Sequence, residues 1–308
     1  MANNDMEYQG GTQRWIEQMA RQLEVQGHLI DLYVHTGAIP NGWNRYDPNA
    51  DYDLALINHH GPFRDLRRAS IRTRIVTSHG VIPDEERVCL GADAYVSVSE
   101  SVRANLPVSS TVIRNPIDGA KFQPRGPVAA SLKRVAFVSN RQGQARSTIE
   151  KACDLGGFDL KVVGREMAVR DPEVIYNWAD LVFGIARTAM EALACGRNVF
   201  AMDYMGSHGM VTANNFDSMR THNFGGHAVG TWPTPEELVA EMSTYDSHRN
   251  LRDRIIPAQS PETVANEYLA LAEQTKPSLV GRVIRRGPLA LSSPRVAESL
   301  PVLSKFST

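Results

Sequence analysis

Short apolar runs alternate along the chain with segments whose apolar positions repeat at helical spacing. Residues 53–58, 74–78 and 134–139 are such runs, and each is followed by polar residues. Near-continuous apolar runs of this length are typical of strands buried on both faces of a parallel sheet. Segment 13–26 instead places its apolar side chains on one helical face, at Trp15, Ile16, Met19, Ala20 and Leu23. This alternation predicts an α/β fold.

The clearest strand–helix–strand unit lies in the second half of the chain. Residues 179–183 form a short apolar run, residues 188–195 are strong helix formers, and residues 198–202 give the next strand. In such units, ligands bind beyond the carboxyl ends of the strands, where helix amino termini present N–H groups. The residues predicted at this edge are Gly184, Arg187, Glu191 and the glycine-rich turn Gly206, Ser207, His208 and Gly209.

The length of the chain and a stretch rich in proline and glycine predict two domains. A chain of 308 residues is long enough for two domains of ordinary size. We place the first domain at 1–122 and the second at 128–275, because prolines and a glycine mark a linker at Pro116, Pro124, Gly126 and Pro127. Residues 276–308 are rich in Pro, Ser and scattered Arg, which predicts a flexible tail with a weak membrane or partner contact through Val280–Arg286.

Composition narrows the class of protein. Apolar residues make up 42% and charged residues 22% of the chain, which fits globular domains with ordinary cores. The net charge of −1 argues against a general nucleic-acid binder. The three cysteines (Cys89, Cys153 and Cys195) fit neither a zinc spacing nor a disulfide framework. With no apolar run of transmembrane length and a polar start, the sequence predicts a soluble, cytoplasmic protein.

Two histidines follow predicted strands and are candidates for chemistry. His79 comes directly after 74–78, and His60 follows 53–58 with His59 between. Polar residues at these positions meet at the ligand-binding edge of a parallel sheet. We rank His79 above His60 and His60 above His59. The alternative for each is a histidine that is hydrogen-bonded for structure alone.

Several familiar catalytic motifs are missing. The pattern Asp51-x-Asp53 resembles a metal-binding pair, but it leads directly into an apolar strand, so we interpret it as a strand edge. No dinucleotide-binding Gly-x-Gly-x-x-Gly follows the first strand, and there is neither a P-loop lysine nor a Gly-x-Ser-x-Gly elbow. A dehydrogenase, a P-loop enzyme and a simple serine hydrolase are therefore not supported.

A family resemblance emerges from two adjacent segments. The sequence from Ala186 reads ARTAMEALACGRNVF, and GSHGMVT follows from Gly206. This pair resembles the donor-binding half of GT-B glycosyltransferases of the family-4-like type (glycosyl transferases group 1). The resemblance implies that Glu191 contacts the ribose of a nucleotide-sugar donor. Phe183 stands where the family's Glu-x7-Glu motif has its first Glu, so only half of the motif is present.

The resemblance extends to further candidate residues. It implies that Gly10 and Gly11 form a ligand loop at a helix amino terminus, although a plain loop is the alternative. It implies that Arg141 and Arg146 grip the donor diphosphate; the alternative is a solvated basic turn. Arg187, in the first turn of the Glu191 helix and beside the missing Glu, is a candidate for binding phosphate instead. The position of the glycine-rich turn adds the backbone N–H groups of three residues as phosphate or sugar contacts. Those three residues are Gly209, Met210 and Val211.

Taken together, the resemblance implies a GT-B fold of two Rossmann-like domains that face each other across a cleft. The implied function is transfer of a hexose-type sugar from a nucleoside diphosphate sugar, UDP- or GDP-linked, to an acceptor. The implied mechanism is metal-independent and retaining, with His79 and His60 near the reacting sugar and no further cofactor. The acceptor class (glycan, lipid, protein or small molecule) stays open. Two alternatives also stay open: a nucleotide-sugar epimerase-like enzyme of the same fold, and a non-catalytic nucleotide-sugar-binding protein.

Overall fold

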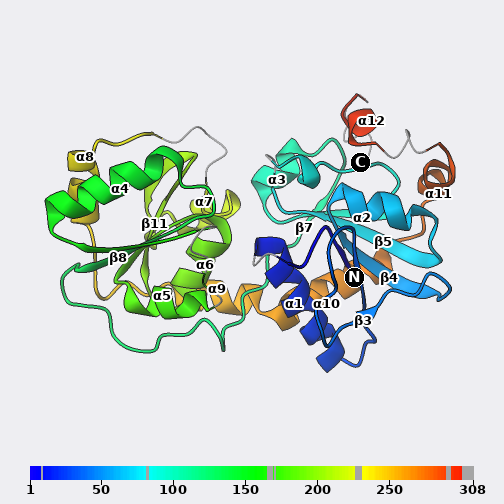
Figure 1. The fold of residues 1–308 in the computed structure, drawn as a ribbon, viewed down its shortest axis with the longest axis horizontal. Coiled ribbons are helices and arrows are strands. Elements are labelled where there is room, and N and C mark those ends of the chain that lie inside the picture. Colours follow the sequence, from blue (N-terminus) through cyan, green and yellow to red (C-terminus); the bar gives the residue numbers. More distant parts are fainter. Residues whose placement is uncertain are drawn as a thin grey trace. The chain divides into compact units, whose positions relative to one another are not determined.

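The structure is a computed structural model that describes residues 1–7, 10–80, 83–164, 169, 171–225, 231–288 and 293–299. The chain divides into two compact units, shown in Figure 1. Unit 1 comprises Met1–Pro116 together with Pro261–Thr308, and unit 2 comprises Ile117–Ser260. Each unit is an α/β sandwich built on its own sheet, so the predicted α/β class with two Rossmann-like units is confirmed. The predicted placement of the two units across a cleft stays a prediction.

Unit 1 is built on a sheet of seven parallel strands in the order β3-β2-β1-β4-β5-β6-β7. The two longest strands, β4 and β5, are buried over their carboxyl-terminal parts, as their apolar runs predict. The first strand has only two residues but lies between β2 and β4. The strands are β1 (Ala2–Asn3), β2 (Asp31–Val34), β3 (Asn44–Arg45), β4 (Tyr52–Asn58), β5 (Ile71–Ser78), β6 (Ala94–Ser97) and β7 (Thr111–Val112).

The helices of unit 1 come from both ends of the chain. From the first part they are α1 (Gly11–Val25), α2 (His60–Asp65) and α3 (Glu100–Asn105), with short 3-10 turns η1 (Leu66–Arg68) and η2 (Asp84–Glu86). From the last part they are α10 (Pro261–Gln274), α11 (Leu279–Arg286) and α12 (Pro294–Ser299). The helix predicted for 13–26 is therefore present, whereas the sequence pattern gave no sign of α2.

Helix α10 belongs to unit 1, not to the second domain (128–275) that the sequence indicated. Tyr268 is fully buried in the same core cluster as Trp15 of α1, and the two rings meet edge to face with centroids 5.5 Å apart. The Tyr268 hydroxyl also lies 2.9 Å from the Thr77 hydroxyl of β5. Burial of this aromatic face against α1 explains why the chain returns to the first unit after Ser260.

Unit 2 is built on a five-stranded sheet in the order β12-β11-β10-β8-β9, in which only β12 runs antiparallel. The strands are β8 (Arg134–Val138), β9 (Asp159–Val163), β10 (Leu181–Phe183), β11 (Asn198–Asp203) and β12 (Gly206–Met210). The glycine-rich segment expected as a turn is therefore an edge strand, hairpinned onto β11.

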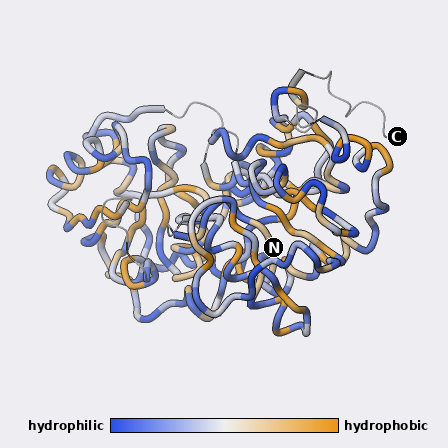
Figure 2. The backbone as a smooth tube through the Cα atoms, turned by 45° about the vertical axis from the view of Figure 1, so that its right-hand side comes forward, coloured by the Kyte–Doolittle hydropathy of each residue, from blue (hydrophilic) through white to orange (hydrophobic). Residues whose placement is uncertain are grey.

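Helices cover both faces of the unit 2 sheet. They are α4 (Gly143–Gly156), α5 (Pro172–Trp178), α6 (Ala186–Ala194), α7 (Phe216–Thr221), α8 (Pro235–Met242) and α9 (Arg252–Gln259). Two core clusters result: one contains Met190 and Leu193 of α6, and the other contains Ile149 of α4 and Leu238 of α8. Figure 2 shows hydrophobic stretches along the strands inside each unit, as the apolar runs predict.

The segment predicted as a flexible tail contains structure in its described part. Helix α11 packs on unit 1 through Arg285, which is 5% exposed and lies 3.3 Å from a carboxylate oxygen of Asp93. The backbone N–H of Ser278 donates to the same oxygen at 2.9 Å. The sequence gave no sign of this anchor because Asp93 lies far away along the chain. Across the described residues, no helix is both long and apolar enough to cross a bilayer.

Candidate functional site

Three loops of unit 2 are neighbours at the carboxyl edge of its sheet. Strand β10 lies between β8 and β11, because Phe183 pairs with Phe137 on one side and Phe200 on the other. Gly184 follows β10 directly, and a Cβ atom built on it would lie 3.1 Å from the carbonyl oxygen of Val138. This close approach, together with a contact of 2.3 Å to Cγ2 of Thr188, disfavours a side chain at position 184, a predicted site residue.

An arginine and a tyrosine bridge the outer two of these loops. Arg141 Nη1 donates to the hydroxyl of Tyr204 at 3.3 Å, and the guanidinium lies 5.3 Å from the Tyr204 ring centroid. Because Arg141 follows β8 and Tyr204 follows β11, this contact passes over the end of β10. Arg141 remains exposed, so its cation faces solvent at the edge where the sequence predicts the donor diphosphate.

Arg146, the second predicted diphosphate ligand, bonds to other residues at the start of its own helix. Arg146 Nε donates to Glu150 at 2.8 Å, and its Nη1 donates to Gln142 at 3.2 Å. The side chains of Arg146 and Glu150 are 44% and 42% exposed, so the ion pair is worth only about 0–1 kcal/mol. The structure thus brings Arg141 to the edge, while Arg146 pairs along α4 with a weak partner.

A buried carboxyl group lies at the end of β11. Asp203 is 2% exposed and accepts the backbone N–H of Met205 at 2.9 Å. Burial raises its pKa to about 6, although that N–H and the charge of Arg141 act in the opposite direction. Residue 203 was not predicted as a site residue, since an aspartate at a strand end resembles ordinary turn chemistry.

Glu191 is fully buried on α6. Its Oε1 accepts Nε–H of Arg187 at 3.0 Å, and its Oε2 accepts the hydroxyl of Tyr176 of α5 at 3.1 Å. The side chain of Arg187 is 10% exposed and that of Glu191 is 0% exposed. The two predicted donor ligands are therefore brought together, but as a pair bonded to each other.

Phe183 is a core residue. It is fully buried, and its ring stacks on that of Phe200 with centroids 4.8 Å apart and planes 25° apart. Position 183 is the last residue of β10 and its side chain belongs to the cluster under α4. The missing Glu of the motif is thus replaced by a packing contact.

The backbone of the glycine-rich strand β12 is hydrogen-bonded to β11 in the sheet. Met210 pairs with Phe200, and the N–H of Val211 donates to the carbonyl of Val199 at 2.8 Å. Gly209 has φ of +86°, a conformation that favours glycine. The N–H of Val211 is therefore occupied, in contrast to its predicted role as a phosphate donor, and the reason is the hairpin that the sequence pattern did not reveal.

His79 lies at the carboxyl edge of the unit 1 sheet. Its Nε2 is 3.0 Å from Oδ1 of Asn58, and its Nδ1 is 3.2 Å from Oδ1 of Asn115. The ring meets Trp15 of α1 edge to face, with centroids 5.6 Å apart. Three neighbours therefore fix the ring orientation, as expected for a positioned site residue and equally for a structural one.

Glu86 connects His79 to His59, which we ranked below His60. The Glu86 carboxylate accepts the backbone N–H of His79 at 2.6 Å and lies 3.4 Å from Nε2 of His59. Burial raises the pKa of Glu86, but His59 and His79 outweigh it and bring the pKa below its ordinary value. His59 has φ of 69°, a strained value for a non-glycine residue. His60 instead begins α2.

The predicted Gly-Gly loop leads into α1 as expected. Helix α1 begins at Gly11, and Gly10 is its N-cap residue without a side-chain cap. A Cβ atom on Gly10 would lie 2.5 Å from Oε1 of Gln13, so a larger residue here would displace the end of that side chain. Helix α1 also carries Trp15, the neighbour of His79, which places the loop and the histidine on the same side of unit 1.

Metal ligands and reactive thiols are not apparent in the described part of the chain. There, no three or more His, Cys, Asp or Glu side chains gather in a way that could hold a metal ion. The three cysteines are free and buried, and burial raises the pKa of each thiol to about 12. The predicted metal independence stays a prediction.

Comparison with known proteins identifies the fold. The sequence matches no protein-family model and no curated protein. Its structure is similar to the crystal structure of AviGT4, a glycosyltransferase involved in avilamycin A biosynthesis, with a TM-score of 0.56. The match covers 86% of this chain and 90% of that chain at 14% sequence identity. The chain therefore has a glycosyltransferase fold.

Proposed function

We propose that the chain is a glycosyltransferase that moves a hexose-type sugar from a nucleoside diphosphate sugar to an acceptor. The likeness of the whole fold to a glycosyltransferase supports the reaction class. The donor would bind at the carboxyl edge of the unit 2 sheet, and the reaction would proceed without a metal and with retention. The UDP- or GDP-linked form of the donor follows from the family resemblance alone.

The observation that carries this proposal is the bridge between Arg141 and Tyr204 over the end of β10. It holds an exposed guanidinium at the same sheet edge where β10 leads through Gly184 into α6, whose N-cap residue Ile185 provides no side-chain cap. A guanidinium and helix N–H groups together attract a diphosphate and stabilise its charge as it leaves. In this proposal, Arg146 joins Arg141 after releasing Glu150, which is a weak surface pair.

The remaining donor contacts depend on the buried pair of Arg187 and Glu191 on α6. Contact between Glu191 and the ribose requires Arg187 or Tyr176 to release one carboxylate oxygen when the donor binds. Arg187 lies in the first turn of α6, and in this proposal its guanidinium binds the donor phosphates after it releases Glu191. In unit 1, His79 and His60 would lie near the transferred sugar or the acceptor, with Asn58 and Asn115 orienting His79.

The test is a thermal-shift screen against UDP-, GDP-, ADP- and TDP-sugars, followed by calorimetry on the best ligand. A ligand that binds the native state raises the apparent stability, by about 2.7 kcal/mol at 100 times its Kd. We expect Arg141→Ala to weaken donor binding without lowering the melting temperature of the free protein. Arg125→Ala, which removes another exposed arginine of unit 2, is the matched control. Unchanged affinity of Arg141→Ala would disprove the assigned donor edge.

A second candidate, a non-catalytic nucleotide-sugar-binding protein, is favoured by one observation. Both positions of the Glu-x7-Glu motif are withdrawn from solvent, because Phe183 and Glu191 are each fully buried. Mass spectrometry of reactions with the bound donor and a panel of acceptors separates the two. A sugar-linked acceptor supports the transferase, whereas binding without turnover across the panel supports the second candidate.

A further inference from the structure

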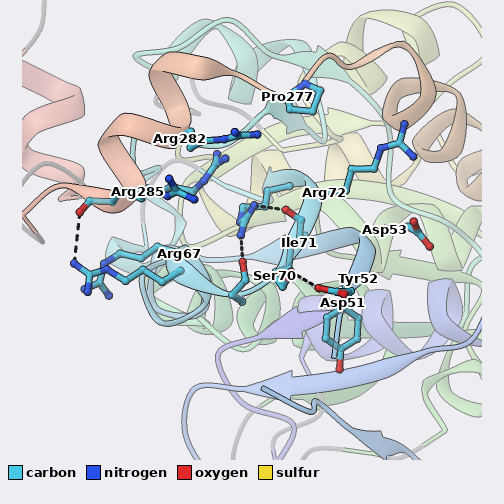
Figure 3. A pocket seen from close by; sticks show the side chains of 14 residues that line it. Asp51, Tyr52, Asp53, Arg67, Ser70, Ile71, Arg72, Pro277, Arg282 and Arg285 are labelled. Carbon is cyan, nitrogen blue, oxygen red and sulfur yellow. Dashed lines mark hydrogen bonds between the residues drawn. The ribbon is translucent and has the colours of Figure 1, made fainter. Parts of the chain in front are cut away.

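Seven arginines line one cavity of unit 1, shown in Figure 3. The cavity has a volume of about 850 Å³ and lies where β4 and β5 begin, at Tyr52 and Ile71. It is therefore at the opposite edge of the sheet from His79. The arginines come from the turn before β5, from β5 itself and from α11: Arg67, Arg68, Arg72, Arg74, Arg282, Arg285 and Arg286.

The positive charge of the cavity is largely uncompensated by its own lining. Two acidic residues, Asp51 and Asp53, line it beside the seven arginines, and Asp93 behind the wall pairs with one of these arginines, Arg285. Asp51 accepts a hydrogen bond from Ser70. Burial lowers the pKa of the Arg74 guanidinium to about 10, and the neighbouring charge of Arg285 acts in the same direction. An arrangement of like charges at this density favours an anionic ligand.

Helix α11 is held firmly at the wall of this cavity. Arg285 is buried and donates to the carbonyl of Gly91, and its guanidinium lies 3.3 Å from Asp93. Gly281 packs so closely that an added Cβ atom would lie 3.0 Å from the same carbonyl. Ser278 caps the helix by accepting the N–H of Gly281 at 2.9 Å. The orientation of α11 is therefore fixed by its inward face, and so are the side chains that point outward.

The outward face of α11 is apolar. Leu279, Val280 and Val283 are 75%, 70% and 70% exposed, although each has a side chain that normally avoids water. Leu279 and Val283 are four residues apart and lie on one helical face, with Val280 beside them. Arg282 and Arg286 are exposed on the flank that faces the cavity. Figure 3 shows Arg282 and Arg285 on this helix at one side of the cavity, with Arg67 and Arg72 also lining it.

We propose that α11 and the arginine cavity together dock unit 1 on the surface of an anionic phospholipid bilayer. The apolar side chains of α11 enter the boundary between headgroups and acyl chains, and lipid phosphates enter the arginine cavity. Helices with an apolar face and a basic flank bind membrane interfaces in this way. A soluble polyanion or a nucleic acid would match the arginines but would leave the three apolar side chains in water.

The test uses the full chain and sedimentation with vesicles of phosphatidylcholine alone or mixed with phosphatidylglycerol. We expect binding only to the mixed vesicles, with weakening at high salt because surface charge is screened. Val283→Asp and Arg282→Glu should each reduce binding. Arg282→Glu changes two unit charges, and at about 1 kcal/mol per charge this corresponds to an approximately 30-fold weaker partition. The matched controls Val174→Asp and Lys151→Glu alter exposed helical residues of unit 2 and should bind as wild type.

Three outcomes would overturn the proposal. Equal binding to the two vesicle types would show that charge does not drive binding. Control variants that bind as weakly as the α11 variants would show that α11 is not the binding site. Normal vesicle binding by Val283→Asp would show that the apolar face of α11 does not enter the membrane, and the cavity would then be a site for a soluble anion. A thermal-shift titration with inorganic pyrophosphate recognises that last case, since Arg282→Glu would then lose the shift while Val283→Asp keeps it. Donor binding in unit 2 is measured separately and does not depend on any of these results.

Discussion

Arg187 donates its Nε–H to Glu191 over 3.0 Å at a place where the glutamate side chain is completely buried. The same relationship, an arginine four residues before a glutamate on one helix, occurs on α4 between Arg146 and Glu150, where both side chains are about half exposed. Local sequence spacing is identical in the two cases. What differs is the surrounding packing, because Tyr176 and the core cover the pair on α6.

This difference leads to the first prediction. Replacing Arg187 with Met leaves the Glu191 carboxylate buried with one charged partner fewer, which we expect to lower the free energy of unfolding by about 3–5 kcal/mol. The matched change Arg146→Met should lower it by less than about 1 kcal/mol. Denaturant unfolding of the two variants measures both values. Equal losses would show that burial of the α6 pair has no energetic consequence.

A double variant separates loss of the pair from loss of packing. In Arg187→Met with Glu191→Leu, no charge is left buried without its partner, so we expect a smaller loss than for Arg187→Met alone. If the losses of the single variants simply add, the two side chains do not interact energetically.

The second prediction concerns Asp203 and pH. Burial raises the pKa of this carboxyl group from 3.8 to about 6. The folded state therefore favours the protonated form, and its stabilising contribution is complete below pH 3.8 and lost as the pH rises through about 6. A difference of this size corresponds to on the order of 3 kcal/mol.

Asp203→Asn tests this linkage with little change in shape. The amide oxygen still accepts the N–H of Met205 but does not ionise. We expect the variant to gain stability relative to wild type as the pH rises from about 4 to about 7, measured by unfolding at several pH values. A difference between the two proteins that stays constant across this range would contradict the assignment.

Sequence patterns predict the longer parallel strands well because these carry apolar runs that a buried sheet accommodates, whereas the two-residue strands β1 and β3 have no such run. Residues 53–58 and 134–139 correspond closely to β4 and β8. The patterns fail where the local sequence is polar or rich in glycine, as in β12, whose pairing with β11 is set by the hairpin.

In the candidate sites too, the sequence predicts what depends on local pattern and misses what depends on distant segments. The sequence places Arg141 and His79 after strands, and the structure confirms that each follows its strand at a carboxyl edge. Partners that come from distant segments are invisible to such reasoning: Tyr204 for Arg141, and Glu86 with Asn115 for His79. The arginine cavity has the same origin, because the strand β5 and the helix α11 that supply its charges lie far apart in the sequence.

The third prediction concerns acid stability of unit 1. Hydrogen bonds with His59 and His79 keep the pKa of Glu86 below its ordinary value of 4.5 despite burial. A carboxyl group with a lowered pKa stabilises the folded state above its unfolded pKa, and this contribution is lost as the pH falls through the folded pKa. Glu86→Gln should therefore cost about 1–3 kcal/mol near neutral pH and progressively less below pH 4.5. A cost that does not change with pH would indicate a purely steric effect.

The fourth prediction concerns the backbone contact that shapes the donor edge. A Cβ atom on Gly184 would lie 2.3 Å from Cγ2 of Thr188 and 3.1 Å from the carbonyl oxygen of Val138. Gly184→Ala should therefore lower the free energy of unfolding by about 1–3 kcal/mol, whereas Gly126→Ala, with open space around it, should not. Adding Thr188→Ser removes the methyl group in the closer contact, so the double variant should recover part of the loss. The remaining loss measures the approach of the β8 and β10 loops together with the contact to Cβ of residue 188, which would be 3.0 Å. Full recovery would show that this approach tolerates a side chain at position 184, and donor affinity measured on the double variant would then test whether the edge needs it.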